Sequence, residues 1–391
     1  MTTALALAAY LSLACGILAV LRRHGAWRLG LFAALNLIAF VGAMVFLNGM
    51  TRETCALYVI TIFVQYLLLY WAERPAKRGH WLPILFPAAL LVYCKLAHGM
   101  AIFGISYLSF RLSYMAVEVR DKVLPRPSLG EYIAFAFFPL LLAVGPITSA
   151  TTFLATLHAP SRAITPLSRS CLRVVAGLVK FNIFAMLLFT LTPQVLLFDG
   201  YRHGRLDLVI GGIAYYGYLF CNFSGYTDIV IGLSGILGIA IDENFDRPYF
   251  ARNLQDFWRR WHITLARYFR DVVYYPLLKI LAKRLGRSHY DTATLVAILV
   301  TFVLTGLWHG ISRSFFFYGL LHAVGLMAHY VYSSQLRMRL GPRMAAYNEN
   351  VYIRVVATLL TFSYVCMTFL YFAYDKAMFV RIWAALNASN T

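Results

Sequence analysis

The sequence predicts an all-α, polytopic membrane protein, and three observations support this. Of its 391 residues, 61% are hydrophobic and only 13% are charged, whereas a soluble chain is about half apolar with about a quarter of its residues charged. Apolar runs of roughly 18 residues or more, the length of a membrane-spanning helix, recur along the whole chain. The net charge of +19 lies in short loops between these runs.

The apolar runs predict about eleven or twelve transmembrane helices in one membrane domain over residues 1–391. The first run follows no positively charged leader and precedes no clear cleavage site, so it is interpreted as a span and not as a signal peptide. Phe137–Ile147 contains Pro and Gly and is expected to be broken or re-entrant. The expected spans are 3–20, 29–48, 55–71, 81–98, 101–118, 131–149, 172–197, 207–221, 226–241, 291–309, 314–332 and 352–374.

The basic loops predict an orientation in the membrane. Lys and Arg concentrate in cytoplasmic loops, so Arg22–Arg28, Glu73–Arg78, Arg337–Arg343 and Arg247–Arg287 are expected to be cytoplasmic, with the N-terminus outside. The segment Arg162–Arg173 fits this alternation poorly, which again indicates a re-entrant stretch. The positive charge forms no continuous face, so membrane lipids and not nucleic acid are the expected partners.

The segment 246–287 has the pattern of a basic amphipathic helix at the cytoplasmic interface. It is too charged to span, and its tryptophans are expected at headgroup depth. Pro276 is expected to break or kink it. The alternative is an ordinary interfacial helix whose arginines reach lipid phosphates. The apolar positions are Leu254, Phe257, Trp258, Trp261, Leu265, Phe269 and Val272, and the charged ones are Arg252, Asp256, Arg259, Arg260, Arg267 and Arg270.

His309 stands in T-G-L-W-H-G, Thr305–Gly310, at the end of an apolar run. An ionisable group in a span is expensive, so it indicates a functional site. The alternative is a histidine that packs helices and bonds to a backbone carbonyl. Gly306 and Gly310 allow a substrate or another backbone to approach closely, and Trp308 is expected to wall a pocket. His322 and His329, in the next span, are interpreted as packing residues.

Other catalytic templates are absent from the sequence. Ile231–Gly235 has the wrong spacing for a nucleophile elbow, and no P-loop, dinucleotide fingerprint or H-E-x-x-H occurs. His203 and Asp207 form an H-x-x-x-D in a short polar loop, which is interpreted as chance. The six cysteines are scattered singly, so neither a disulfide framework nor a metal centre is expected.

Two motifs together resemble the membrane-bound O-acyltransferase (MBOAT) superfamily: F-W-R-R-W-H-I-T-L, Phe257–Leu265, and the downstream T-G-L-W-H-G. The resemblance extends over most of the chain and implies the MBOAT fold, with re-entrant and interfacial helices around a central tunnel. Further segments resemble the bacterial polysaccharide-modifying branch, namely Phe103–Arg111, Phe137–Ile147, Asn222–Gly232 and Asn244–Tyr249.

Two types within that branch compete. The chain length, and I-S-Y-L-S-F-R followed by V-E-V-R-D (Val117–Asp121), are similar to D-alanyl transferases of the DltB type. The alginate O-acetyltransferases of the AlgI type usually place G-G-N after Y-I-P-L, whereas here Leu278-Lys279 follows Leu277. Against the DltB type, Thr148-Ser149-Ala150 replaces its usual D-R-Y, and F-W-R-R-W-H-I-T-L is slightly more similar to the acetyltransferase form. The DltB type is favoured, with acetyl transfer as the alternative.

The resemblance implies acyl transfer from a cytoplasmic thioester to a hydroxyl, with His309 and His262 as catalytic residues and no bound cofactor. His309 would accept the hydroxyl proton. The donor is expected to be a phosphopantetheine-linked, DltC-like acyl-carrier protein, or acetyl-CoA. Residues expected at the donor site or tunnel are Trp258, Arg259, Arg260, Trp261, Arg267, Arg270, Trp308, Asn222, Ser224, Tyr226 and Asp228. For the polar strip from Asn222 to Asp228, bonding between helices is an equal alternative.

The resemblance also implies partners and a location. An SGNH/DltD-like single-span partner outside the membrane, and a small single-span peptide that supplies a relay hydroxyl, fit the DltB type. The bacterial cytoplasmic membrane is the expected location. Two rival classes remain, a transporter of lipid-linked sugars and a non-catalytic scaffold, and neither explains the two histidine motifs.

Overall fold

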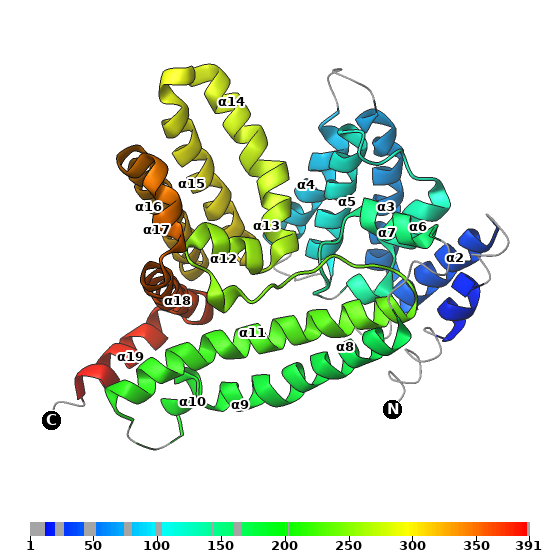
Figure 1. Ribbon diagram of the computed structural model, residues 1–391. Helices are drawn as coiled ribbons and strands as arrows, with labels where there is room; N and C mark the ends of the chain where they lie inside the picture. The colour runs from blue at the N-terminus through cyan, green and yellow to red at the C-terminus, as the bar shows by residue number, and fades with distance from the viewer. Residues whose placement is uncertain are drawn as a thin grey trace. The chain divides into compact units, whose positions relative to one another are not determined.

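The structure is a computed structural model that describes residues 12–19, 27–42, 52–73, 80–97, 104–142, 144–159, 166–199, 201 and 203–388 (Figure 1). Every regular element in these ranges is helical. The chain divides into two compact units, residues 1–177 with 226–243 and residues 178–225 with 244–391. Each unit is described by itself.

The first unit contains a helix over residues 12–19 and the helices α2 to α8. Their bounds are α2 (Trp27–Gly42), α3 (Arg52–Ala72), α4 (Leu82–Ala97), α5 (Ile105–Arg120), α6 (Leu129–Ala136), the 3-10 turn η2 (Pro139–Leu141), α7 (Ala150–Leu157) and α8 (Leu167–Val179).

The second unit contains most of α11 (Arg205–Ile236) and the elements from Pro248 onward. Its other elements are η4 (Lys180–Phe184), α9 (Ala185–Thr190), α10 (Pro193–Leu196), η5 (Pro248–Phe250), α12 (Leu254–Arg260), α13 (Ile263–Phe269), η6 (Arg270–Tyr274), α14 (Tyr275–Leu285), η7 (Arg287–His289), α15 (Tyr290–His309), α16 (Arg313–Leu340), η8 (Gly341–Arg343), α17 (Met344–Glu349), α18 (Val351–Ala373) and α19 (Lys376–Ala388).

The chain is a multi-pass membrane protein. Within the described residues, five helices are long and apolar enough to cross a bilayer: Leu167–Thr190, Arg205–Ile236, Arg287–His309, Arg313–Glu349 and Val351–Ala373. Three shorter apolar helices are Arg28–Gly42, Tyr58–Ala72 and Leu82–Cys94. The expected spans 172–197, 291–309, 314–332 and 352–374 fall on the long helices, whereas most of 3–20, Arg22–Arg28 and Glu73–Arg78 lies outside the described residues.

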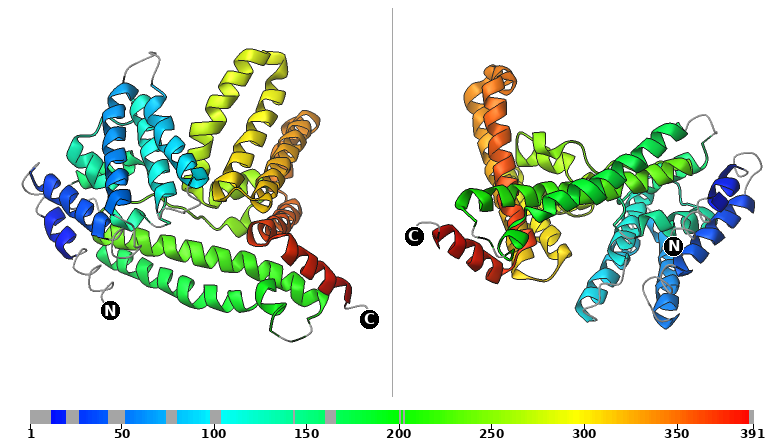
Figure 2. Two further views of the ribbon diagram at one scale, coloured as in Figure 1. Left: turned by 180° about the vertical axis from the view of Figure 1, so that it is seen from behind. Right: turned by 90° about the horizontal axis from the view of Figure 1, so that it is seen from below.

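The prediction of two separate spans over 207–221 and 226–241 was wrong. Helix α11 runs without interruption over 32 residues from Arg205 to Ile236, and it is drawn as one continuous green helix in Figure 2. The polar sequence N-F-S-G-Y, Asn222–Tyr226, does not interrupt it. Two polar residues of this part of the helix have partners: Tyr226 accepts from Val144 N, and Asp228 pairs with Arg173 of α8.

The interruption expected in Phe137–Ile147 is confirmed, and buried charges stabilise it. Helix α6 ends at Ala136, and fully buried Arg111 donates to the carbonyls of Phe135 at 3.0 Å and Ala136 at 3.3 Å. A cation at a helix C-terminus satisfies both the carbonyls and the helix dipole. At the start of α7, the Glu118 carboxylate accepts from Ala150 N at 2.8 Å.

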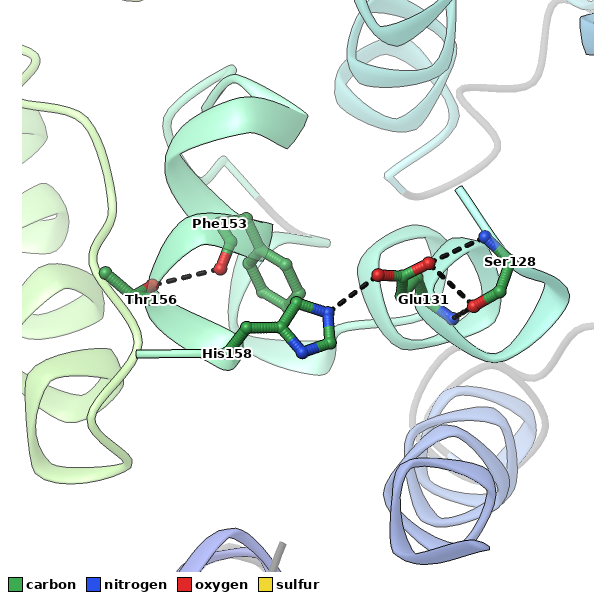
Figure 3. Close-up of polar contacts among 5 residues, drawn as sticks. All are labelled: Ser128, Glu131, Phe153, Thr156 and His158. Carbon is green, nitrogen blue, oxygen red and sulfur yellow. Dashed lines mark hydrogen bonds and ion pairs between the residues drawn. The ribbon is translucent and has the colours of Figure 1, made fainter. Parts of the chain in front are cut away.

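Helices α6 and α7 are also joined at their outer ends (Figure 3). Ser128 and Glu131 form a capping box at the start of α6, and His158, the C-cap of α7, lies 2.6 Å from Glu131 Oε1. Partial burial raises the pKa of the Glu131 carboxyl, but hydrogen bonds from Ser128 and the contact with His158 outweigh it and hold that pKa below its ordinary value. Glu131 therefore remains an anion that holds both helices.

In the second unit, α15 and α16 pack side by side at two glycines (Figures 1 and 2). A Cβ on Gly306 would lie 2.3 Å from Phe315 O, and one on Gly319 would lie 2.4 Å from Phe302 O. Because neither glycine has a side chain, the backbones of α15 and α16 come into direct contact at these two positions. This contact fixes the last turn of α15, on which His309 stands.

We expect Gly306→Ala to destabilise the protein by about 1–3 kcal/mol, because the new methyl group must push α16 away. Gly212→Ala is the matched control, since a Cβ there meets only the Leu370 methyl groups at 3.9 Å. Thermal unfolding in detergent measures both. Equal midpoints for the two variants would contradict the glycine contact.

Candidate functional site

The segment predicted as one amphipathic helix is broken at His262. Helix α12 ends at Arg260, and α13 begins at Ile263 after His262, whose φ of 44° lies in the left-handed region. This conformation is uncommon for a residue with a side chain and marks a strained position. Pro276, which was expected to break or kink the segment, lies in the first turn of α14, and α14 continues directly from the π turn Arg270–Tyr274. The helix is therefore not broken at Pro276.

Asn244, which precedes this segment, closes the break. Its backbone oxygen accepts from Ile263 N at 3.0 Å. Its side-chain Oδ1 accepts from Thr264 N at 3.2 Å and from Thr264 Oγ1 at 2.8 Å, and lies 3.0 Å from His262 Nδ1. Asn244 is fully buried. The turn and the imidazole are therefore held by one side chain.

The His262 ring is enclosed by protein. It is 3% exposed and packs edge-on against Phe223, with the ring centroids 4.7 Å apart. Trp308 lies 6.5 Å from it, centroid to centroid. Burial lowers the pKa of the His262 imidazole well below its ordinary value, and nearby His309 lowers it further. His262 is therefore neutral at neutral pH.

His309, the last residue of α15, sits in an aromatic surround. Its ring centroid lies 4.3 Å from that of Trp308, 4.8 Å from Phe372, 5.8 Å from Phe315 and 6.0 Å from Tyr318. The structure thus brings His262, Trp308 and His309 together. Gly306 was expected to admit either a substrate or another backbone. In the structure the backbone of α16 occupies the space next to it.

A cavity of about 730 Å³ opens near the segments that carry these histidines, although His262, Trp308 and His309 themselves are not among its lining residues. Of the expected donor-site residues, Trp258, Arg259, Arg267 and Arg270 line it. Its wall includes Ile263, next to His262, and Thr305, one helical turn before His309. The cavity therefore reaches both segments that bear the histidines, and its polar lining is cationic.

Several lining residues were not predicted. His329, interpreted as a packing residue, lines the cavity together with Arg337, Tyr330 and Ser333 of α16. Thr301 and Thr305 of α15 also line the cavity. Residues 301, 305 and 309 are four apart, so they lie on one face of a helix, and this spacing could have identified the two threonines from the sequence.

Other predicted residues lie outside the cavity. Arg260 pairs with Asp256 at 2.8 Å and Asp246 at 3.6 Å. Trp261 stacks on Phe257 with centroids 5.7 Å apart. Trp258 and Trp261 are 7% and 4% exposed, so both pack inside the protein, and their expected headgroup depth stays a prediction.

The polar strip on α11 is divided between the two units. Asn222 and Ser224 belong to the second unit, and Ser224 is buried. Tyr226 and Asp228 belong to the first, where Tyr226 accepts from Val144 N at 3.4 Å and Asp228 pairs with Arg173 at 3.0 Å. For Asp228 the structure shows the alternative role, bonding between helices.

The remaining histidines have structural partners. His322 is fully buried, with Nε2 3.1 Å from Thr368 Oγ1, as expected for a packing residue. His203 lies 2.9 Å from the Asp199 carboxylate.

Comparison with known proteins places the site in context. A model described as MBOAT, membrane-bound O-acyltransferase family, matches residues 45–374. Teichoic acid D-alanyltransferase of Streptococcus thermophilus is 32% identical over 69% of this chain and 68% of its own length, and that of Bacillus subtilis is 29% identical over the same shares. The probable alginate O-acetylase AlgI of Pseudomonas aeruginosa is 31% identical over 59% of this chain and 43% of its own length.

The lowered pKa of His262 predicts a pH dependence of stability. Below the ordinary value of about 6.5 the unfolded chain binds a proton that the buried ring does not, so stability is present above that pH and is lost as pH falls through it. Between pH 7.5 and 5.5 the loss from this group is about 1.4 kcal/mol. His262→Gln removes this loss, so its unfolding midpoint is expected to fall less than that of the wild type. Exposed His289 is the control, and His289→Gln with the same reduced fall would contradict the assignment.

Proposed function

This chain belongs to the membrane-bound O-acyltransferase family, and on that premise we propose that it transfers a D-alanyl group from a cytoplasmic carrier-protein thioester to a hydroxyl of an extracytoplasmic cell-envelope polymer or relay partner. The observation that carries this proposal is the cationic cavity whose wall ends one helical turn from His309. The longer match to relatives named teichoic acid D-alanyltransferase favours D-alanyl as the acyl group.

The cavity has the chemistry to take a phosphopantetheine arm. Arg259, Arg267 and Arg270 line it with guanidinium groups, which bind phosphate through paired hydrogen bonds, and Arg270 also pairs with the Asp271 carboxylate at 2.8 Å. Trp258 also lines the cavity, and its Nε1 is buried without a hydrogen-bond partner among the described residues. An amide or thioester oxygen of the arm supplies the acceptor that this N–H lacks.

His309 acts on the hydroxyl, which is the weak partner, because a thioester is already activated. The hydroxyl oxygen attacks the acyl carbon while the His309 ring takes its proton. The C–S bond then breaks, and the thiolate leaves with the proton held by His309, so the products are an ester and a free thiol. The aromatic surround of His309 keeps water from competing with the hydroxyl.

The location and partners follow from the same proposal. The chain resides in the bacterial cytoplasmic membrane, with an acidic carrier protein docking on its cytoplasmic face through electrostatic attraction to the basic segment 246–287. An SGNH-type single-span partner, with or without a small single-span peptide, receives or passes on the acyl group outside.

Acetyl transfer is the second candidate. The similarity to AlgI relatives supports it, and the phosphates of coenzyme A suit the same arginines. The two candidates differ in donor and not in the role of His309.

We expect His309→Ala to lower transfer by 10²- to 10⁴-fold, the usual contribution of a general base. The measurement offers D-alanyl-charged carrier protein and acetyl-CoA separately to liposomes that contain the protein, its membrane partner and an acceptor. Label moving from the charged carrier alone supports D-alanylation, and label moving from acetyl-CoA alone supports the second candidate. Undiminished transfer by a folded variant would remove His309 from the mechanism.

Arg259 and Arg260 are neighbours with different surroundings, so they test the cavity. We expect Arg259→Gln to weaken carrier binding and to reduce its salt dependence, because a cavity cation is lost. Arg260→Gln, which removes a guanidinium paired with Asp256 outside the cavity, is the control and is expected to bind nearly as the wild type does. Binding of phosphopantetheinylated carrier at rising salt gives the answer, and equal losses in both variants would argue against donor entry here.

A further inference from the structure

Among the polar contacts near the cavity, the cluster of Asn244, His262 and Thr264 fixes a proton position. Thr264 N is a backbone donor and reaches the Asn244 side chain at 3.2 Å. A backbone N–H donates and never accepts, so the atom that it meets must be the amide oxygen. The side-chain oxygen and nitrogen of an asparagine are similar in size and are easily interchanged. At Asn244 the hydrogen bond from Thr264 N determines which of the two is the oxygen.

The oxygen in turn determines the state of the imidazole. Asn244 Oδ1 has lone pairs and no hydrogen, and it lies 3.0 Å from His262 Nδ1. Nδ1 must therefore bear the proton and donate it. In a neutral ring the other nitrogen, Nε2, then holds the lone pair. Nδ1 meets Asn244 and Nε2 lies on the other side of the ring.

We infer that Asn244 is a positioning residue for acyl transfer, which holds His262 as the neutral tautomer with its proton on Nδ1 and its lone pair on Nε2. This inference rests on the proposed function for its consequence in the reaction. The tautomer itself follows from the hydrogen bonds alone.

The cost of the arrangement supports a role beyond packing. Asn244 is fully buried, and its Nδ2 has no hydrogen-bond partner within the described residues. An unsatisfied buried donor costs about 1–3 kcal/mol. His262 adds a strained left-handed backbone at the same place. Two unfavourable features in one turn are characteristic of a site retained for its chemistry.

A neutral amide at position 244 also matters for charge. When His309 takes the hydroxyl proton it becomes a cation, and a charged His262 close to it would oppose that step. The groups that contact or act on the His262 ring include Asn244, Phe223 of α11, and Trp308 and His309 of α15. Of these, His309 is the one that titrates. An aspartate at position 244 would favour the charged form of His262, whereas asparagine orients the ring without doing so.

The first test reads the tautomer directly. Nitrogen-15 NMR of histidine-labelled protein distinguishes a protonated Nδ1 from a protonated Nε2, and the His262 signal is identified by its loss in His262→Gln. We expect protonated Nδ1 and unprotonated Nε2 at neutral pH in the wild type. A proton on Nε2 would overturn the inference. This readout needs no transfer activity, so it remains valid even if neither donor supports transfer and the proposed function fails.

The second test uses Asn244→Asp, which keeps an acceptor oxygen for Nδ1 but adds a charge. We expect the apparent pKa of the acid limb of kcat/KM against pH to rise by about one to three units, with activity recovered at high pH. Asn253→Asp is the matched control, because Asn253 caps α12 and lies outside the cavity lining. An unchanged pH profile in Asn244→Asp, with thermal unfolding like that of the wild type, would reduce Asn244 to a structural residue.

Discussion

The close crossing of α15 and α16 at Gly306 and Gly319 is the contact on which the second unit depends. It places His309 at the end of a helix whose neighbour begins only four residues later, at Arg313. Because the two backbones touch, the remaining faces of both helices are free to form one wall of the cavity, with Thr301 and Thr305 from one helix and His329 and Arg337 from the other. A helix pair held by side chains would fill that space.

The second constraint is that polar groups buried in an apolar protein need hydrogen-bond partners. Unit 1 places Arg111 on helix-end carbonyls and Glu118 on a helix start, so its buried charges satisfy backbone groups. Unit 2 leaves Trp258 Nε1 and Asn244 Nδ2 buried without partners among the described residues. Such groups are expensive, and these two stand in the segment 244–264, which carries His262 and contributes to the cavity wall; the first unit also has such atoms, among them Arg111 Nε and Ser234 Oγ.

The sequence predicts well what is local. Spans such as 291–309 and 352–374 are confirmed because an uninterrupted apolar run determines them, and the interruption at Phe137–Ile147 is confirmed because Pro139 and Gly145 mark it. The break at His262 was not predictable in this way. No Gly or Pro marks it, and it is made by hydrogen bonds to Asn244, 18 residues earlier. The division of α11 into two expected spans was wrong for a similar reason, because Tyr226 and Asp228 lie within one helix and contact Val144 and Arg173, which are distant in sequence.

The candidate site was likewise predictable from the sequence only in its local features. The two histidines were located by their motifs, but their relation to each other, and the assignment of Arg259 to the cavity and Arg260 to a surface ion pair, depend on the turn between α12 and α13. The turn divides the basic segment into two short helices, and arginines of both, Arg259 of α12 and Arg267 of α13, line the cavity. An uninterrupted amphipathic helix would put its arginines on a single polar face and could supply a membrane anchor. The broken one supplies a cavity wall in which exposed Arg259 stands close in sequence to buried His262, as the proposed capture of a charged donor requires.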